Sequence, residues 1–255
     1  MDDITLGGTR KEVSDDVQLF NEDRIKIGLR LNETKCEVIA RDHLQPTGSL
    51  EGFSVVSSEN ASHLGALLSP GDALDNALEV KCSDLRTAIS RLKSIAAHYA
   101  LILLRSSFSA PRLMHILRCA PCINHPLLLS HDSLLREGIS VITISCLIDI
   151  HWLQASLSIR DGGLGIRRVS SLAFSAFFAS AANTRDLQNR MLVASNIGVD
   201  TVIASAQDTW SSFNALTCPS ETDARRQRSW DKLNVTRDVK AIWDGASSEM
   251  NKARL

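Results

Sequence analysis

The sequence predicts a predominantly helical α+β fold. Three observations lead to this prediction. The first 70 residues carry short alternating apolar runs between glycine turns, whereas apolar residues after residue 71 recur mostly at helical spacing. The 255 residues are 44% hydrophobic and 22% charged, which is ordinary globular usage. Aromatic residues make up only 5%, so aliphatic side chains must supply most of the core.

Residues 1–70 are expected to form a small α+β unit. A β-like run at 4–6 ends at a Gly-Gly turn, and Thr9 and Glu12 have the spacing of a capping box for a helix that stops near Gly28. Residues 35–40 alternate like a strand. Two further strands at 53–56 and 63–68, separated by a turn at residues 59–60, are expected to form a hairpin.

The rest of the chain is expected to be helical. Residues 72–105 predict one long helix or two stacked helices, and Ser109 before Pro111 predicts the start of a helix that runs to about Cys119. Pro121 and Pro126 are expected to interrupt the helical pattern, and 160–165 is expected to be a loop. Further helices are predicted at 132–149, 169–194, 200–216 and 222–245.

Charge is distributed unevenly along the chain. Residues 1–85 have a net charge of −8, residues 86–190 of +7 and residues 191–255 of zero, and 20 of the 28 basic residues are Arg. An acidic front beside a basic middle fits a site for divalent cations next to a surface for phosphates. The alternative is that amphipathic helices simply spread their charges over a solvated face.

The sequence disfavours a membrane or secreted protein. Its longest apolar runs, near 100–104 and 138–148, are shorter than the roughly 18 residues that a membrane span needs. The first residues are acidic, unlike a secretory signal, and the six cysteines are expected to be reduced thiols. We therefore expect an intracellular protein, in the cytoplasm or the nucleus, without a membrane partner.

Three motifs follow one another in the first 70 residues. They read MDDITLGG at 1–8, GLRLNETKCE at 28–37 and HLGALL at 63–68. In this order and spacing they resemble the catalytic Tyr-x-Asp-Asp turn, the next palm motif and the primer-grip hairpin of reverse transcriptases from non-LTR (LINE-type) retrotransposons. Residues 112–118, 152–157 and 161–167 are similar to the helical thumb and post-thumb region of that family, whereas 191–255 carry no motif that we can place.

The resemblance implies a partial polymerase palm (hairpins plus one helix) at 1–70, a thumb-like and post-thumb region at 71–190 and a helical segment of unknown role at 191–255. Its partners would be an RNA template and a DNA primer, with a dNTP as substrate of the parent enzyme. The candidate catalytic residues are Asp2 and Asp3, as ligands of Mg²⁺ or Mn²⁺, and Lys35 beside the departing pyrophosphate. Leu64 and Gly65 would form the primer grip, and the candidate nucleic-acid contacts are Arg105, Arg112, Arg118, Arg167 and Arg168.

The sequence also departs from the family pattern. The Tyr of Tyr-x-Asp-Asp, the fingers and the strand with a third metal-binding carboxylate have no counterpart in the 255 residues. We therefore expect metal binding to be weak and this polypeptide alone not to polymerise DNA. A non-catalytic nucleic-acid-binding module that uses the basic helices of 86–190, and a relic without function, remain as alternatives.

Two smaller patterns leave alternatives open. Two His residues flank a Cys-x-x-Cys pair in the set His115, Cys119, Cys122 and His125, which predicts either a zinc site or, with more weight, buried thiols. The glycine-rich run at 161–168 ends in two arginines and precedes a helix. It predicts either a phosphate contact through backbone amides or a structural turn, and no complete Walker or GxGxxG pattern is present.

Overall fold

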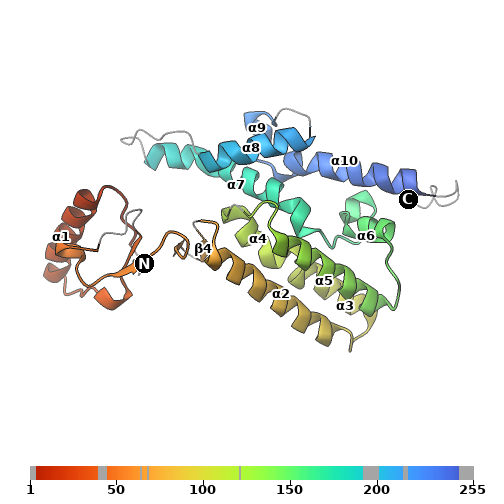
Figure 1. The fold of residues 1–255 in the computed structure, drawn as a ribbon, viewed down its shortest axis with the longest axis horizontal. Coiled ribbons are helices and arrows are strands. Elements are labelled where there is room, and N and C mark those ends of the chain that lie inside the picture. Colours follow the sequence, from red (N-terminus) through yellow and green to blue (C-terminus); the bar gives the residue numbers. More distant parts are fainter. Residues whose placement is uncertain are drawn as a thin grey trace. The chain divides into compact units, whose positions relative to one another are not determined.

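A computed structural model describes residues 4–39, 45–63, 65–67, 69–120, 122–191, 201–214 and 218–246 (Figure 1). The chain divides into two compact units, 1–62 and 63–255, each with its own internal contacts. Helices dominate, and the described strands are two or three residues long. The predicted predominantly helical α+β class is therefore confirmed.

The first unit consists of one helix and a small sheet. Its elements are α1 (Arg10–Lys26), the 3₁₀ turn η1 (Glu33–Lys35), β1 (Glu37–Ile39), the 3₁₀ turn η2 (Gly48–Leu50) and β2 (Ser54–Val56). The predicted capping box is present, because the Thr9 hydroxyl accepts the Glu12 N–H while the Glu12 carboxylate accepts the Thr9 N–H. The helix ends at Lys26, and its C-cap Ile27 precedes Gly28 at φ +76°.

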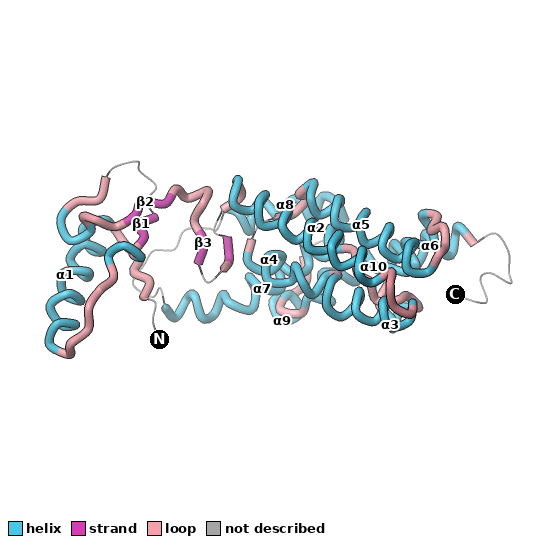
Figure 2. The backbone as a smooth tube through the Cα atoms, turned by 90° about the horizontal axis from the view of Figure 1, so that it is seen from below, coloured by secondary structure: helices cyan, strands magenta, loops and turns pink. Residues whose placement is uncertain are grey.

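The strands of this unit do not pair as the sequence predicted. β1 and β2 lie side by side (Figure 2). They run parallel, with Glu37, Val38 and Ile39 opposite Ser54, Val55 and Val56. Residues 4–6, expected to be β-like, have no regular secondary structure. The local alternation identified β1 and β2, but strand direction depends on contacts that are distant in sequence.

The second unit is a stack of helices preceded by a minimal hairpin. At the junction of the units, β3 (Ser62–His63) pairs with β4 (Ala66–Leu67). The elements that follow are α2 (Asp72–Leu92), α3 (Ala97–Leu103), the π-helical segment η3 (Leu104–Phe108), α4 (Ala110–Cys119), α5 (Pro126–Thr143), α6 (Asp149–Ser156), the 3₁₀ turn η4 (Ile159–Asp161), α7 (Val169–Met191), α8 (Thr201–Asn214), α9 (Glu221–Ala224) and α10 (Gln227–Gly245).

Helix α5 begins earlier than predicted. Pro126 is its first residue and not an interruption, because the first helical position needs no amide donor and suits the fixed φ of proline. The His125 ring then caps the helix, since its Nδ1 accepts the Leu127 N–H at 3.2 Å. The expected long helix at 72–105 divides into α2 and α3, which was one of the two alternatives.

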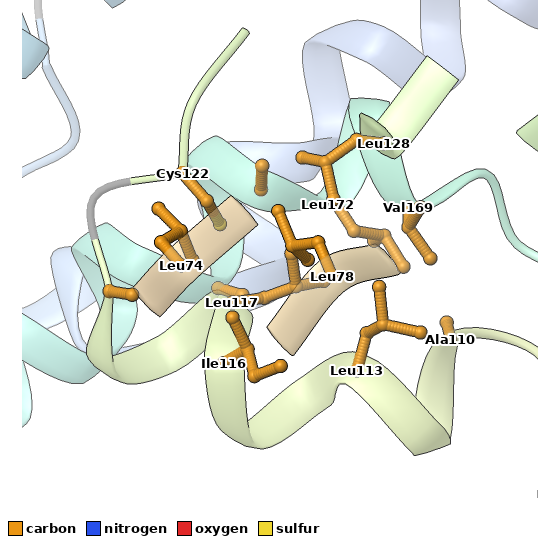
Figure 3. Close-up of a cluster of buried hydrophobic side chains, with 13 residues drawn as sticks. Leu74, Leu78, Ala110, Leu113, Ile116, Leu117, Cys122, Leu128, Val169 and Leu172 are labelled. Atoms are coloured by element: carbon orange, nitrogen blue, oxygen red, sulfur yellow. The ribbon is translucent and has the colours of Figure 1, made fainter. Parts of the chain in front are cut away.

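The core of the second unit has three parts. In the first, leucines of α2 meet one face of α4 and the start of α7, around Leu74, Leu78, Leu113, Leu117 and Leu172 (Figure 3). A second cluster joins the end of α2 to α3, α5 and α6, and a third stacks the aromatic rings of α7, α8 and α10. Burial of these large side chains stabilises each by about 1.5–3 kcal/mol, so the helices hold one another in fixed positions.

Among the helices that the structure describes, none has the length and apolar character needed to cross a membrane.

Candidate nucleic-acid interface

Helix α4 separates its apolar and basic residues onto opposite faces. Ala110, Leu113, Ile116 and Leu117 are buried against α2 and α7 (Figure 3). Arg112, His115 and Arg118 are exposed. Their spacing of three residues places them in one row along the helix, which we call the α4 basic row. At 1.5 Å per residue the row is about 9 Å long, which matches roughly two to three nucleotides of one strand.

The predicted primer-grip glycine lies against this row. Gly65 has φ +75° in the turn between β3 and β4, a backbone conformation that glycine adopts without strain. A Cβ atom built on Gly65 would be 3.9 Å from Nε2 of His115, the middle residue of the row. The structure therefore brings Gly65 together with the helix that carries Arg112 and Arg118, whereas Leu64 lies outside the described residues.

Positive charge on this part of the chain has little internal compensation. Residues 85–131 contain six Lys or Arg residues and no Asp or Glu. Arg112 meets Asp84 of α2 only at 3.5 Å, with side chains that are 55% and 47% exposed, so water screens the pair. Arg118 has no acidic partner within the described ranges. The α4 basic row is therefore able to attract phosphate groups.

Arg105 lies apart from the row, in the π-helical segment η3. Its stem packs over the glycine-rich loop, where Cδ lies 3.0 Å from the Cβ position of Gly165. The side chain is half-buried. Its methylene groups therefore support the loop and leave the guanidinium as the only part suited to a phosphate.

Arg167 and Arg168 have acidic partners inside the chain. Arg167 binds Asp231 of α10 at 2.6 Å, and Arg168 binds Asp238 of the same helix. All four side chains are less than a quarter exposed. These arginines hold α10 against the start of α7, so their charge is already compensated before any ligand arrives.

The first five residues of the glycine-rich run form a structural turn. The backbone amides of residues 161–165 all donate hydrogen bonds to carbonyl oxygens of residues 155–159, at distances of 2.8 to 3.2 Å. Gly163 is required there, because a Cβ atom would lie 2.3 Å from the Leu157 carbonyl oxygen. These five amides are therefore already bonded within the loop, which favours a structural turn over a phosphate contact through them.

The predicted catalytic residues are largely outside the described part of the chain. Asp2 and Asp3 both belong to the undescribed residues. Lys35 is the exposed last residue of η1, two residues before β1 begins at Glu37. Its ammonium group is therefore solvated, and the metal-binding role of the two carboxylates remains a prediction.

The cysteine–histidine set does not form a metal site. Cys119 Sγ is 3.9 Å from His115 Nδ1, but Cys122 is buried, and its burial raises the pKa of the thiol to about 11. Both ring nitrogens of His125 are engaged, Nδ1 by Leu127 and Nε2 by Asp75 at 2.7 Å. Within the described residues no group of three potential ligands comes together. Cys122 is a buried thiol, as expected, whereas Cys119 is exposed.

Sequence reasoning missed two buried polar residues of α5. Asp132 accepts the N–H groups of Val169 and Ser170 at 2.7 and 3.2 Å, and thereby caps the start of α7 from a neighbouring helix. Burial raises its pKa, although these hydrogen bonds act in the opposite direction. The adjacent His131 is 1% exposed and its ring nitrogens make no hydrogen bond to the described chain. Only the helical pattern, which places 131 and 132 among apolar positions, signalled their burial.

Comparison of the chain with family models, with curated proteins and with solved structures finds no match.

Proposed function

We propose that the chain is part of an RNA-directed DNA polymerase of a non-LTR retrotransposon and that the α4 basic row holds the sugar–phosphate backbone of its RNA–DNA duplex. The observation that carries the proposal is the closeness of Gly65 to His115, since a Cβ atom added to Gly65 would lie 3.9 Å from the ring nitrogen Nε2. Two motifs that are separated by about 50 residues therefore lie near each other. The family resemblance assigns the first to the primer grip and the second to the thumb-like region.

The positive charge of the α4 basic row explains how it would bind the nucleic acid. Arg112 and Arg118 present guanidinium groups that can each donate two hydrogen bonds to one phosphate, and Asp84 competes weakly for only one of them. Neutralising phosphates releases condensed counterions, so such binding is insensitive to sequence and weakens as salt rises. Residues 85–131 contain no Asp or Glu, so this segment adds no negative charge of its own that would repel a nucleic acid.

In this proposal the metal ions belong to the catalytic end of the first unit. Asp2 and Asp3 would hold Mg²⁺, which would stabilise the charge that develops during phosphoryl transfer. Binding by the α4 basic row does not require these carboxylates. Replacing both by alanine should leave duplex affinity unchanged, which separates the binding role from the catalytic one.

A salt titration tests the binding role. Fluorescence anisotropy with a short blunt RNA–DNA hybrid should give an affinity that falls steeply with salt. The variant Arg112→Ala/Arg118→Ala should lower the slope of log K against log salt by about two, one for each lost phosphate contact. The matched control Lys232→Ala/Lys240→Ala removes two exposed cations of α10 and should behave like the unaltered chain. An equal loss in both variants, or an affinity that does not change with salt, would contradict the proposal.

A primer-extension assay tests the catalytic expectation. We expect no templated incorporation by the 255-residue polypeptide with Mg²⁺ or with Mn²⁺, because residues 1–85 offer no third carboxylate with the required motif. Incorporation above background that disappears in the Asp2→Ala/Asp3→Ala variant would show that this expectation is wrong.

A further inference from the structure

An exposed aromatic pair lies at the corner between α2 and α3. The rings of His98 and Tyr99, in the first turn of α3, have centroids 3.9 Å apart. Tyr99 is the only tyrosine of the chain and is 61% exposed. Neither ring has a structural role in the core, which at this point rests on Ala100 and Leu104.

Basic side chains flank the corner on the preceding helix. Arg91 lies in the last turn of α2, and Lys93 follows as its C-cap, and both are exposed. Leu92 between them is buried in the same cluster as Ala100, the neighbour of Tyr99. The two cations thus lie at the end of the helix that precedes Tyr99, within eight residues of it in the sequence, and their buried neighbour shares a core cluster with the residue after Tyr99. They belong to the same acid-free segment, 85–131, as the α4 basic row.

We infer that this corner binds an unpaired, single-stranded part of the nucleic acid, with a base stacked on Tyr99 and the adjoining phosphates on Arg91 and Lys93. The inference rests on the proposed function and extends it from duplex to single strand. Every base has a π-face, so an exposed ring beside cations binds single strands without sequence preference. Bases inside a duplex are already stacked on one another, so they gain nothing from the ring.

Charge favours nucleic acid over a protein at this face. Apolar side chains at 95 and 102 are also exposed here, at 45% and 51%, and by themselves would suit a second copy of the chain. A second copy, however, would bring the same two cations, Arg91 and Lys93, to the contact. Such a contact would be repulsive, whereas a phosphate chain neutralises the charges.

The experiment compares two probes on the full chain. One is a blunt RNA–DNA hybrid, and the other is the same hybrid with a single-stranded extension. The unaltered chain should bind the extended probe more tightly, and Tyr99→Ala should remove that gain, on the order of tenfold, without changing affinity for the blunt probe. Tyr99→Phe, which keeps the ring, and Ile102→Ala, which removes apolar surface from the same helix, should retain the gain.

Several outcomes would overturn the inference. The first is that Tyr99→Ala still prefers the extended probe as the unaltered chain does. The second is that Tyr99→Ala loses the same affinity for both probes. The third is that Ile102→Ala removes the preference as fully as Tyr99→Ala does. A fourth is loss of self-association in Tyr99→Ala, measured by light scattering, with nucleic-acid affinity unchanged, which would assign the face to a second copy. If the blunt hybrid itself is not bound, the proposed function fails. If the blunt hybrid is bound but the extension adds nothing, only the single-strand inference fails.

Discussion

His131 is a buried histidine whose charge the fold does not accommodate. The ring is 1% exposed, and neither nitrogen has a hydrogen-bond partner in the described chain. Burial therefore disfavours the protonated form and lowers the pKa from 6.5 to about 4. At neutral pH the ring is uncharged and the fold tolerates it.

This histidine should make stability depend on pH. Between pH 6.5 and about 4 the unfolded chain takes up a proton that the folded chain does not, so acidification favours unfolding. The free energy of unfolding should fall by on the order of 3 kcal/mol over this range. Urea denaturation at several pH values measures the change. His131→Phe should flatten the profile above pH 4, and a profile identical to that of the unaltered chain would contradict the assignment.

Some residue roles follow from sequence and others do not. Thr9 and Glu12 could be assigned because a capping box involves residues three apart. The carboxylate of Asp132 could not be assigned, because it caps a helix that begins 37 residues later. Arg167 and Arg168 were chosen as phosphate contacts from their charge, and the acidic residues that pair with them lie 64 and 70 residues further along.

At the scale of the elements, two ion pairs join α10 to the start of α7. The Arg167–Asp231 pair is the more buried, since the Asp231 side chain is 9% exposed and its Oδ1 has no hydrogen-bond partner among the described residues. The Arg168–Asp238 side chains are 24% and 18% exposed. Water can therefore compensate the loss of the second pair better than the loss of the first.

Because the two ion pairs differ in burial, breaking them should lower the free energy of unfolding by different amounts. Arg167→Ala leaves a buried carboxylate without its cation and should lower the free energy of unfolding by about 3 kcal/mol. Arg168→Ala should cost about 1 kcal/mol. The double variant Arg167→Met/Asp231→Leu, which removes both charges, should recover much of the stability that Arg167→Ala loses. Urea denaturation measures the free energy of unfolding of the three variants. An equal loss in the two single variants would show that burial does not determine how much each ion pair contributes.

The bounds of the elements were largely predictable where local signals set them. The extents of α1 and α4 follow from caps, proline and apolar spacing within a few residues. The parallel pairing of β1 with β2 was not predictable, because neither strand alone specifies the direction of its partner. The closeness of Gly65 to His115 belongs to the same class, since it depends on how α4 packs against β4, far from it in the sequence.

At the scale of the whole molecule, the two units differ in the core that each possesses. The described residues of the first unit bury only three apolar side chains, Val17, Leu50 and Ala61. Eight large apolar side chains of the same unit are exposed: Ile4, Leu6, Leu19, Ile25, Ile27, Leu29, Ile39 and Val55. Parallel strands normally lie between covering layers, yet β1 and β2 each expose an apolar side chain. The second unit instead has three buried clusters.

This difference predicts that the first unit opens far more often than the second. A two-stranded sheet with one helix and so small a core cannot offset the loss of conformational entropy by itself. Hydrogen exchange of the full chain, followed by mass spectrometry, should show rapid exchange in peptides from α1, β1 and β2 and slow exchange in α2, α4 and α7. Under the proposed function, further polymerase strands would cover the exposed valine and isoleucine side chains of this sheet. Equal protection of β1 and α4 in the isolated chain would show that the first unit is complete without them.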